Sequence, residues 1–222
     1  MTNKSLILGA IAALLGGTAQ AQTTITWDMS GGIGPPGMKV GTTHDFTDGG
    51  ITITAAGFTT PNFTPTALFL KDARPGGDEV GLGIADPAGG DDNEITGNHA
   101  VVVNFSNAVA AGVTKMSFDF QMNSVTDGDS WRVFGSDAGL HGPFTDMIAH
   151  GQDENVHINL PLFDFYEFTA PTGDVLLRAV SGVKAPAAVP LPSTLPLFAS
   201  GLALLGLAGW RKGRKSAAVV AA

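Results

Sequence analysis

The chain has 222 residues, no cysteine and a formal net charge of −8 at neutral pH. The absence of cysteine excludes disulfides, c-type haem attachment, thiol catalysis and cysteine-ligated zinc. All 20 acidic residues lie between Asp28 and Asp174, and residues 22–184 carry only seven of the 12 Lys and Arg, so this part has a formal charge of −13. Such an acidic segment repels nucleic acid and anionic lipid, and we expect neither as its partner.

The first 21 residues predict a secretory signal peptide. Lys4 supplies a positive charge, Leu6–Leu15 form an apolar segment of about ten residues, and Ala19 and Ala21 form an A-x-A cleavage site. Signal peptidase would therefore leave a mature chain that begins at Gln22. An uncleaved membrane anchor is the alternative interpretation.

Residues 22–184 predict an all-β domain. Short segments with period-2 alternation, or rich in β-branched and aromatic residues, are separated by Gly, Pro, Asn and Asp. The expected strands are Thr23–Met29, Gly50–Ala56, Ala67–Lys71, Val80–Ile84, Ala100–Phe105, Thr114–Met122, Ser130–Gly135, Val156–Leu160, Phe163–Thr169 and Asp174–Val180. This pattern favours a two-sheet β-sandwich, jelly-roll-like, with little helix. A closed barrel is the alternative.

An acidic stretch between residues 78 and 94 is the main candidate for a binding site. Calcium takes six to eight oxygen ligands from carboxylates, amides and carbonyls on a flexible loop, and this stretch is rich in glycine and lacks Lys and Arg. The predicted calcium ligands are Asp78, Glu79, Asp86, Asp92, Asn93 and Glu94. The spacing is not that of an EF-hand, and a solvated acidic loop is the alternative.

Other chemistry has weaker support. Carboxylates in pairs leave glycoside hydrolysis open, because two acids at a suitable separation perform it. The histidines (His44, His99, His141, His150 and His157) show no zinc-binding spacing, although His150 and His157 could converge. We therefore predict no catalytic residue and no cofactor other than calcium. The aromatic side chains of Trp27, Trp131 and Tyr166 could stack on sugars, but core packing is the preferred interpretation.

The C-terminal part resembles a signal for sorting and proteolytic processing. After a linker over residues 185–188, Val189, Pro190, Leu191, Pro192 and Ser193 form a short motif that leads to an apolar span from Leu195 to Trp210. Arg211, Lys212, Arg214 and Lys215 then form a basic stop, and residues 216–222 a short tail. As a single hydrophobic helix, the span would cover roughly 24 Å, less than the roughly 30 Å hydrocarbon core. The basic stop predicts that residues 22–188 face away from the cytoplasm.

Motif, span and basic stop over residues 189–215 resemble a PEP-CTERM sorting signal of the VPLPA type. Ser193 departs from the final position of that motif, and the tail is longer than usual. The resemblance implies an exported protein of Gram-negative bacteria and recognition by an exosortase, a membrane-embedded cysteine protease or transpeptidase. It also implies a producer of extracellular polysaccharide.

The preceding domain resembles ectodomains that accompany such signals. The resemblance rests on Gly76-Gly77-Asp78-Glu79, Gly81-Leu82-Gly83, Asp92-Asn93-Glu94-Ile95, the segment Trp131–Ser136, Phe163–Phe168 and Val175-Leu176-Leu177. It implies a sandwich and supplies no activity.

These features together predict a non-enzymatic protein of the cell surface or extracellular (biofilm) matrix that associates with extracellular polysaccharide. Before processing it would be anchored in the inner membrane with its ectodomain in the periplasm. Two alternatives stay open: a secreted glycan-active hydrolase, and a membrane-anchored ectodomain that docks another protein.

Overall fold

The computed structural model describes residues 22–30, 37–71, 79–86, 93–123, 128–152, 155–186 and 200–206, with backbone alone for 117–123 and 155–157. The chain separates into two units, Met1–Pro186 and Ala187–Ala222. The predicted signal peptide, sorting motif and basic stop lie outside the described residues.

The first unit is all-β, and its described strands form two sheets in which every pairing is antiparallel. The nine-stranded sheet has the order β1 (Thr23–Asp28), β16 (Ala179–Lys184), β10 (Val113–Asn123), β15 (Asp174–Leu177), β7 (Gly81–Ile84), β6 (Leu68–Lys71) and β2 (Met38–Gly41). In addition, β13 (Asn155–Leu160) pairs with β10, and β8 (Ile95–Thr96) pairs with β15.

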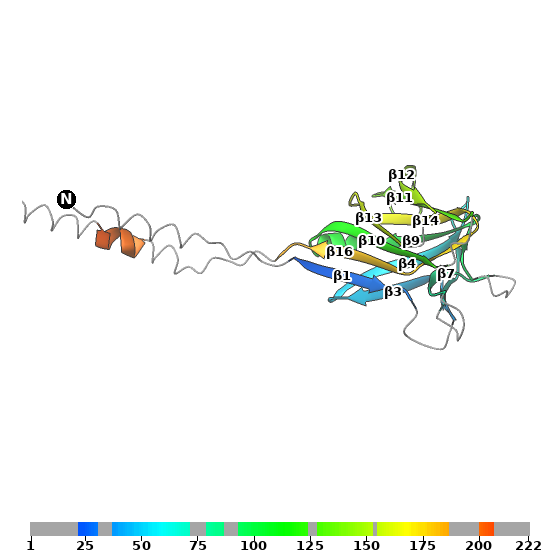
Figure 1. Ribbon diagram of the computed structural model, residues 1–222, viewed down its shortest axis with the longest axis horizontal. Helices are drawn as coiled ribbons and strands as arrows, with labels where there is room; N and C mark the ends of the chain where they lie inside the picture. The colour runs from blue at the N-terminus through cyan, green and yellow to red at the C-terminus, as the bar shows by residue number, and fades with distance from the viewer. Residues whose placement is uncertain are drawn as a thin grey trace, which may run out of the picture. The chain divides into compact units, whose positions relative to one another are not determined.

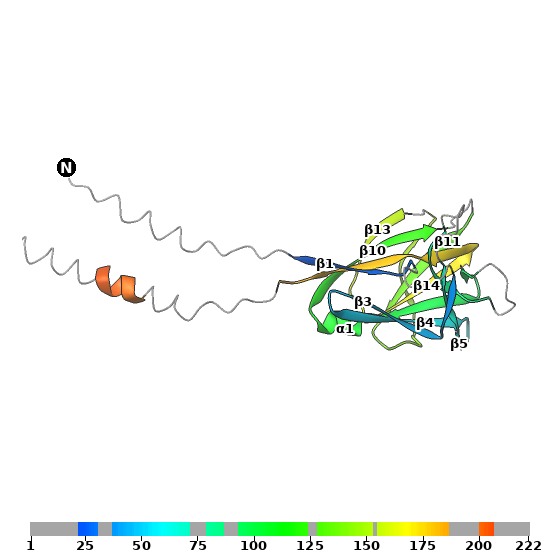
Figure 2. The same ribbon diagram turned by 90° about the horizontal axis from the view of Figure 1, so that it is seen from below.

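The seven-stranded sheet has the order β12 (Asp146–Gly151), β11 (Ser130–Ser136), β14 (Phe165–Thr172), β9 (His99–Asn104), β4 (Ile51–Thr59) and β3 (Thr43–Asp48), and β5 (Thr64–Thr66) pairs with β4. Figure 1 shows the strands of this unit. In Figure 2, β1, β10 and β13 lie in one layer and β3, β4 and β5 in the other.

The core lies between the two sheets. Alternate residues of both sheets, among them Ile25, Ile53 and Leu82, are at most 2% exposed and belong to one apolar cluster. The short helix α1 (Ser106–Ala110) packs against β4 and β10 and buries Ala108. Period-2 alternation therefore buries one face of strands such as β1 and the first half of β4, as the sequence predicts.

The three aromatic side chains singled out in the sequence are core residues. Trp27 and Trp131 are each 1% exposed and Tyr166 is fully buried. The indole N–H of Trp27 donates to the Ile51 carbonyl at 2.9 Å, and the Tyr166 hydroxyl donates to the Pro161 carbonyl at 2.7 Å. Their polar tips are thus partnered inside the fold, which confirms core packing and leaves none of the three exposed for sugar stacking.

All ten predicted strands overlap an observed one, but the sequence does not predict five further short strands. These are β2, β3, β5, β8 and β12. Strand β3 shows why: of its six residues only Phe46 is buried, so its sequence carries no apolar alternation. The predicted strand Asp174–Val180 is divided, because β15 ends at Leu177 and β16 begins at Ala179.

A second, smaller apolar cluster covers the outer face of the seven-stranded sheet. Its buried members are Ala56, Phe58 and Val102, and Phe63, Leu140, Phe144 and Phe165 pack against them. The ring of Phe63 lies 5.6 Å from that of Phe58 and stacks on Phe144 at 5.9 Å. Two connections, before β5 and before β12, therefore shield part of this face from water.

The second unit is described only over residues 200–206, which are helical. The rest of the predicted span from Leu195 to Trp210 lies outside the described residues. Among the described residues, no helix has both the length and the apolar character needed to cross a membrane.

Candidate functional site

The predicted calcium ligands lie before and after strand β7. Glu79, Asp86, Asn93 and Glu94 are described, whereas Asp78 and Asp92 lie outside the described residues. The backbone N–H of Asp86 donates to Asn93 Oδ1 at 3.0 Å. The residues just after β7 and just before β8 are thereby joined.

A glycine in β7 allows this segment to pack closely on the sheet. A Cβ atom at Gly83 would lie 2.1 Å from the Asn93 carbonyl oxygen and 2.8 Å from Glu94 Cα. No other residue type fits under such contacts, so Gly83 permits the close approach of residues 93 and 94. The side chain of Glu94 is left only 3% exposed as a result.

Lys71, at the end of β6, neutralises this segment. Its ammonium group forms ion pairs with Glu79 Oε2 and Glu94 Oε1. Burial acts to lower the pKa of Lys71, but the hydrogen bonds and charges of the two glutamates outweigh it and raise that pKa. For Glu94 burial prevails over the ammonium group and raises the pKa of the carboxyl to about 7. Glu94 Oε2 is buried and has no hydrogen-bond partner among the described residues.

This ion-pair cluster differs from the predicted calcium site. Glu79 and Glu94 hold an ammonium group from a strand that the sequence pattern did not connect with them. Within the described part of the chain, no three His, Asp or Glu residues gather closely enough to hold a metal ion. Calcium at these two carboxylates would have to displace Lys71, and the predicted roles of Asp78 and Asp92 stay predictions.

The histidines whose side chains are described make separate contacts. His44 packs on Phe46, and His141 packs on Phe58. His99 Nδ1 lies 3.0 Å from Thr96 Oγ1, and burial lowers its pKa. His150 lines the pocket described next, while the side chain of His157 is not described.

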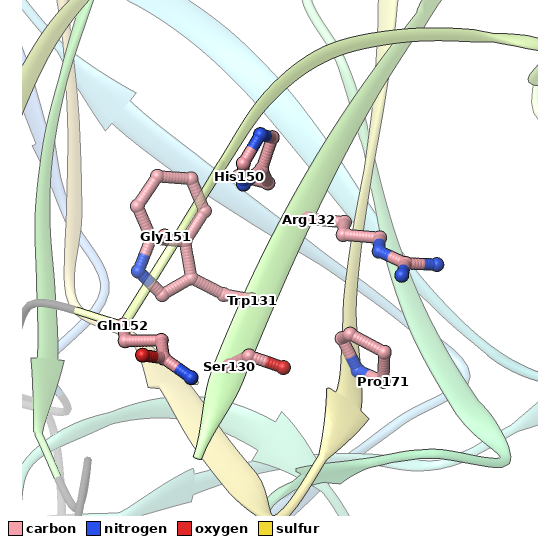
Figure 3. A pocket seen from close by; sticks show the side chains of 7 residues that line it. All are labelled: Ser130, Trp131, Arg132, His150, Gly151, Gln152 and Pro171. Atoms are coloured by element: carbon pink, nitrogen blue, oxygen red, sulfur yellow. The ribbon is translucent and has the colours of Figure 1, made fainter. Parts of the chain in front are cut away.

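A pocket of about 490 Å³ opens beside strand β11 (Figure 3). It is lined by Ser130, Trp131, Arg132, His150, Gly151, Gln152 and Pro171, which come from β11, from β12 and the residue after it, and from β14. Its volume lies within the range of small-molecule sites. Figure 3 shows the side chains of Trp131 and Arg132 leaving β11 on opposite sides.

Strand register explains how these residues meet. Arg132 lies directly opposite His150 on β12 and Thr169 on β14. The register between β11 and β14 shifts next to Arg132, since Ser130 pairs with Thr172, and a bulge of this kind re-aims side chains. Sequence reasoning missed this pocket, because its residues come from three separate segments, and β12 was not predicted as a strand.

Gly151 closes the floor of the pocket against the core. A Cβ atom there would lie 2.5 Å from Trp131 Cζ2. The backbone of β12 therefore lies directly on the buried indole, and the polar groups of Arg132, His150 and Gln152 remain exposed above it.

Glu167 is a further ionisable group that the sequence did not single out. It lies on β14 between the buried core residues Tyr166 and Phe168, so it faces the outer side of the sheet. It is only 6% exposed, and its cross-strand neighbours are Val102 and Phe134. Burial raises the pKa of its carboxyl group to about 7.

Comparisons with models of protein families, with curated proteins and with solved structures gave no match to this chain.

Proposed function

We propose that this chain is an exported, non-enzymatic protein of the cell surface or extracellular matrix, which associates with extracellular polysaccharide. The observation that carries the proposal is the order of elements along the sequence. An A-x-A signal peptide is followed by an acidic domain without cysteine, the VPLPS motif, an apolar span and a basic stop. Signal peptidase and an exosortase would act on the two ends, after a transient stage in the inner membrane with the domain in the periplasm.

The architecture of the first unit is compatible with this role. Two antiparallel sheets with a shared core give a cysteine-free domain that needs no disulfides for stability. We propose a jelly-roll-like connection of these strands and domain limits at residues 22 and 184. The linker, sorting signal and tail would then follow at 185–188, 189–215 and 216–222, with residues 195–210 as one hydrophobic helix.

The two described carboxyl groups with raised pKa values are poorly placed for acid catalysis, which supports binding over hydrolysis. A general acid must reach the substrate to within hydrogen-bonding distance. Glu94 and Glu167 have raised pKa values but are only 3% and 6% exposed. Neither carboxyl group is presented to a glycan, and Glu94 is also paired with Lys71.

Intact mass of the mature protein, from native envelope and from culture medium, tests the sorting half of this proposal. We expect a chain that begins at Gln22 and ends within or near Val189–Ser193. A chain that runs from Gln22 to Ala222 and is confined to membranes would leave a simple membrane anchor instead.

Co-sedimentation with the producer's own polysaccharide tests the binding half. We expect the protein to pellet with the polysaccharide and to release no reducing sugar from it. Release of reducing sugar, stopped by substitution of two particular carboxylates, would establish the hydrolase alternative. Failure to pellet would refute the association.

A further inference from the structure

We propose that the pocket beside β11 binds the carboxylate group of an acidic sugar residue in that polysaccharide, with Arg132 as the main anion-binding group. This inference rests on the proposed function, because it names the kind of glycan that the domain would hold. The polar lining of the pocket, its volume and its local charge carry the inference.

Arg132 is a cation that the described fold does not use. Both ion pairs within the described residues involve Lys71. The side chain of Arg132 is exposed, and its two cross-strand neighbours, His150 and Thr169, carry no negative charge. Asp129, a sequence neighbour, is 8% exposed and packs against Gly173. Among the described residues, the guanidinium of Arg132 has no anionic partner. It is therefore a local site for an anion, although the formal charge of −13 opposes anionic ligands over the domain as a whole.

The surrounding groups suit a carboxylate attached to a sugar. A guanidinium presents parallel N–H donors that match a carboxylate in a bidentate manner. His150 lies directly across from Arg132, and paired residues of this kind have Cβ atoms about 4.5–5.5 Å apart. Its imidazole, the Gln152 amide and the Ser130 hydroxyl provide further polar groups for ring hydroxyls. The cavity of about 490 Å³ has room for one sugar residue.

Pro171 and Trp131 form the apolar part of the lining. Pro171 lies at the register shift between β11 and β14, where it offers no N–H donor to the pocket. Trp131 is held below the polar groups by the core and is only 1% exposed. The pocket thus presents a cation and several polar groups above a floor that the core holds in place. The ordering cost of binding therefore falls on the exposed side chains of Arg132, His150 and Gln152.

Calorimetric titration of the purified full chain with oligogalacturonate tests the inference. The matched ligand is the methyl ester of the same oligosaccharide, which has the same ring hydroxyls and no negative charge. We expect the acid to bind and the ester to bind at least about tenfold more weakly, because the ester carries no charge for the guanidinium to pair with. Equal binding of acid and ester, or no binding of the acid, would overturn the inference.

Variants assign the binding to this pocket. Arg132→Gln should weaken oligogalacturonate binding at least about tenfold, and Arg132→Lys should recover only part of it, because an ammonium group lacks the bidentate fork. Lys115→Gln is the matched control, since it removes one positive charge from an exposed position on the other sheet and should leave binding unchanged. Circular dichroism checks the fold of each variant, and His150→Ala gives a second, independent loss at the same pocket. Unchanged binding in Arg132→Gln refutes the assignment.

Two further results separate the possible failures. If acetate binds as tightly as oligogalacturonate, the pocket takes free carboxylates and the sugar part of the inference is wrong. If the chain pellets with native polysaccharide but binds no acidic oligosaccharide, the proposed function survives and this inference fails. If it does neither, both fail.

Discussion

Substitution of Glu167 by glutamine should stabilise the protein, and the gain should grow with pH. The carboxyl group of Glu167 is 6% exposed on the outer face of the seven-stranded sheet, and no hydrogen bond or ion pair joins it to another described residue. Burial raises its pKa from 4.5 to about 7 in the folded protein. Ionisation of this group therefore opposes folding at neutral pH.

The sign and the size of the effect follow from proton linkage. Between the two pKa values the unfolded chain has lost the proton that the folded protein still holds. The folded state is therefore favoured at low pH, and this contribution is lost as the pH rises toward 7. A folded pKa of about 7 makes the loss about 2.5 kcal/mol between roughly pH 5 and pH 8. Glu167→Gln removes the titrating group and keeps the shape of the side chain.

Urea unfolding of wild type and variant across this pH range measures the effect. The difference in unfolding free energy should widen by about 2.5 kcal/mol in favour of the variant, roughly 5–10 °C in melting temperature for a domain of this size. Glu94 also titrates near pH 7, but it is present in both proteins and cancels. Exposed Asp146 on the same sheet serves as control, because Asp146→Asn makes the same charge change without burial. A variant whose advantage is the same at both ends of the range would refute the reasoning.

Three further predictions concern the segment around β7. Lys71→Met should lower the unfolding free energy by about 3 kcal/mol near neutral pH, because it leaves Glu94 buried without its counter-ion. The loss should be smaller near pH 5, where the Glu94 carboxyl group is protonated. A loss that is the same at both pH values in urea unfolding contradicts this. Gly83→Ala should lower the unfolding free energy by about 2 kcal/mol, since the new Cβ atom would lie 2.1 Å from the Asn93 carbonyl oxygen. An unchanged melting temperature would mean that residues 93 and 94 do not pack on β7. Millimolar calcium should raise the melting temperature through the acidic loop, and Asp92→Ala should abolish that rise; no shift in wild type ends the calcium hypothesis.

The sequence predicts the class of fold because the alternation of apolar and polar residues in a strand is a local pattern. Alternation such as Ile51-Thr52-Ile53-Thr54 predicts a strand and its buried face without reference to any partner, and each of the ten expected strands overlaps an observed one. Edge strands such as β3 and β12 were missed, because an exposed strand needs no apolar alternation. The core role of Trp27 and Trp131 was also the favoured prediction, and burial confirms it.

The sites depended on pairing across the sheets, which no local pattern encodes. Lys71 and Glu94 are separated by 23 positions in the chain, yet they share an ion pair because β6, β7 and the segment before β8 lie together. Arg132, His150 and Pro171 meet only through the register of β11 with its two neighbours. A shift of one residue would turn each of these side chains to the opposite face. The sequence by itself thus determined that the domain is all-β, acidic and built around a period-2 core. Only the tertiary structure decided which charges are neutralised and that Arg132 lies exposed beside His150, because register sets which residues become neighbours.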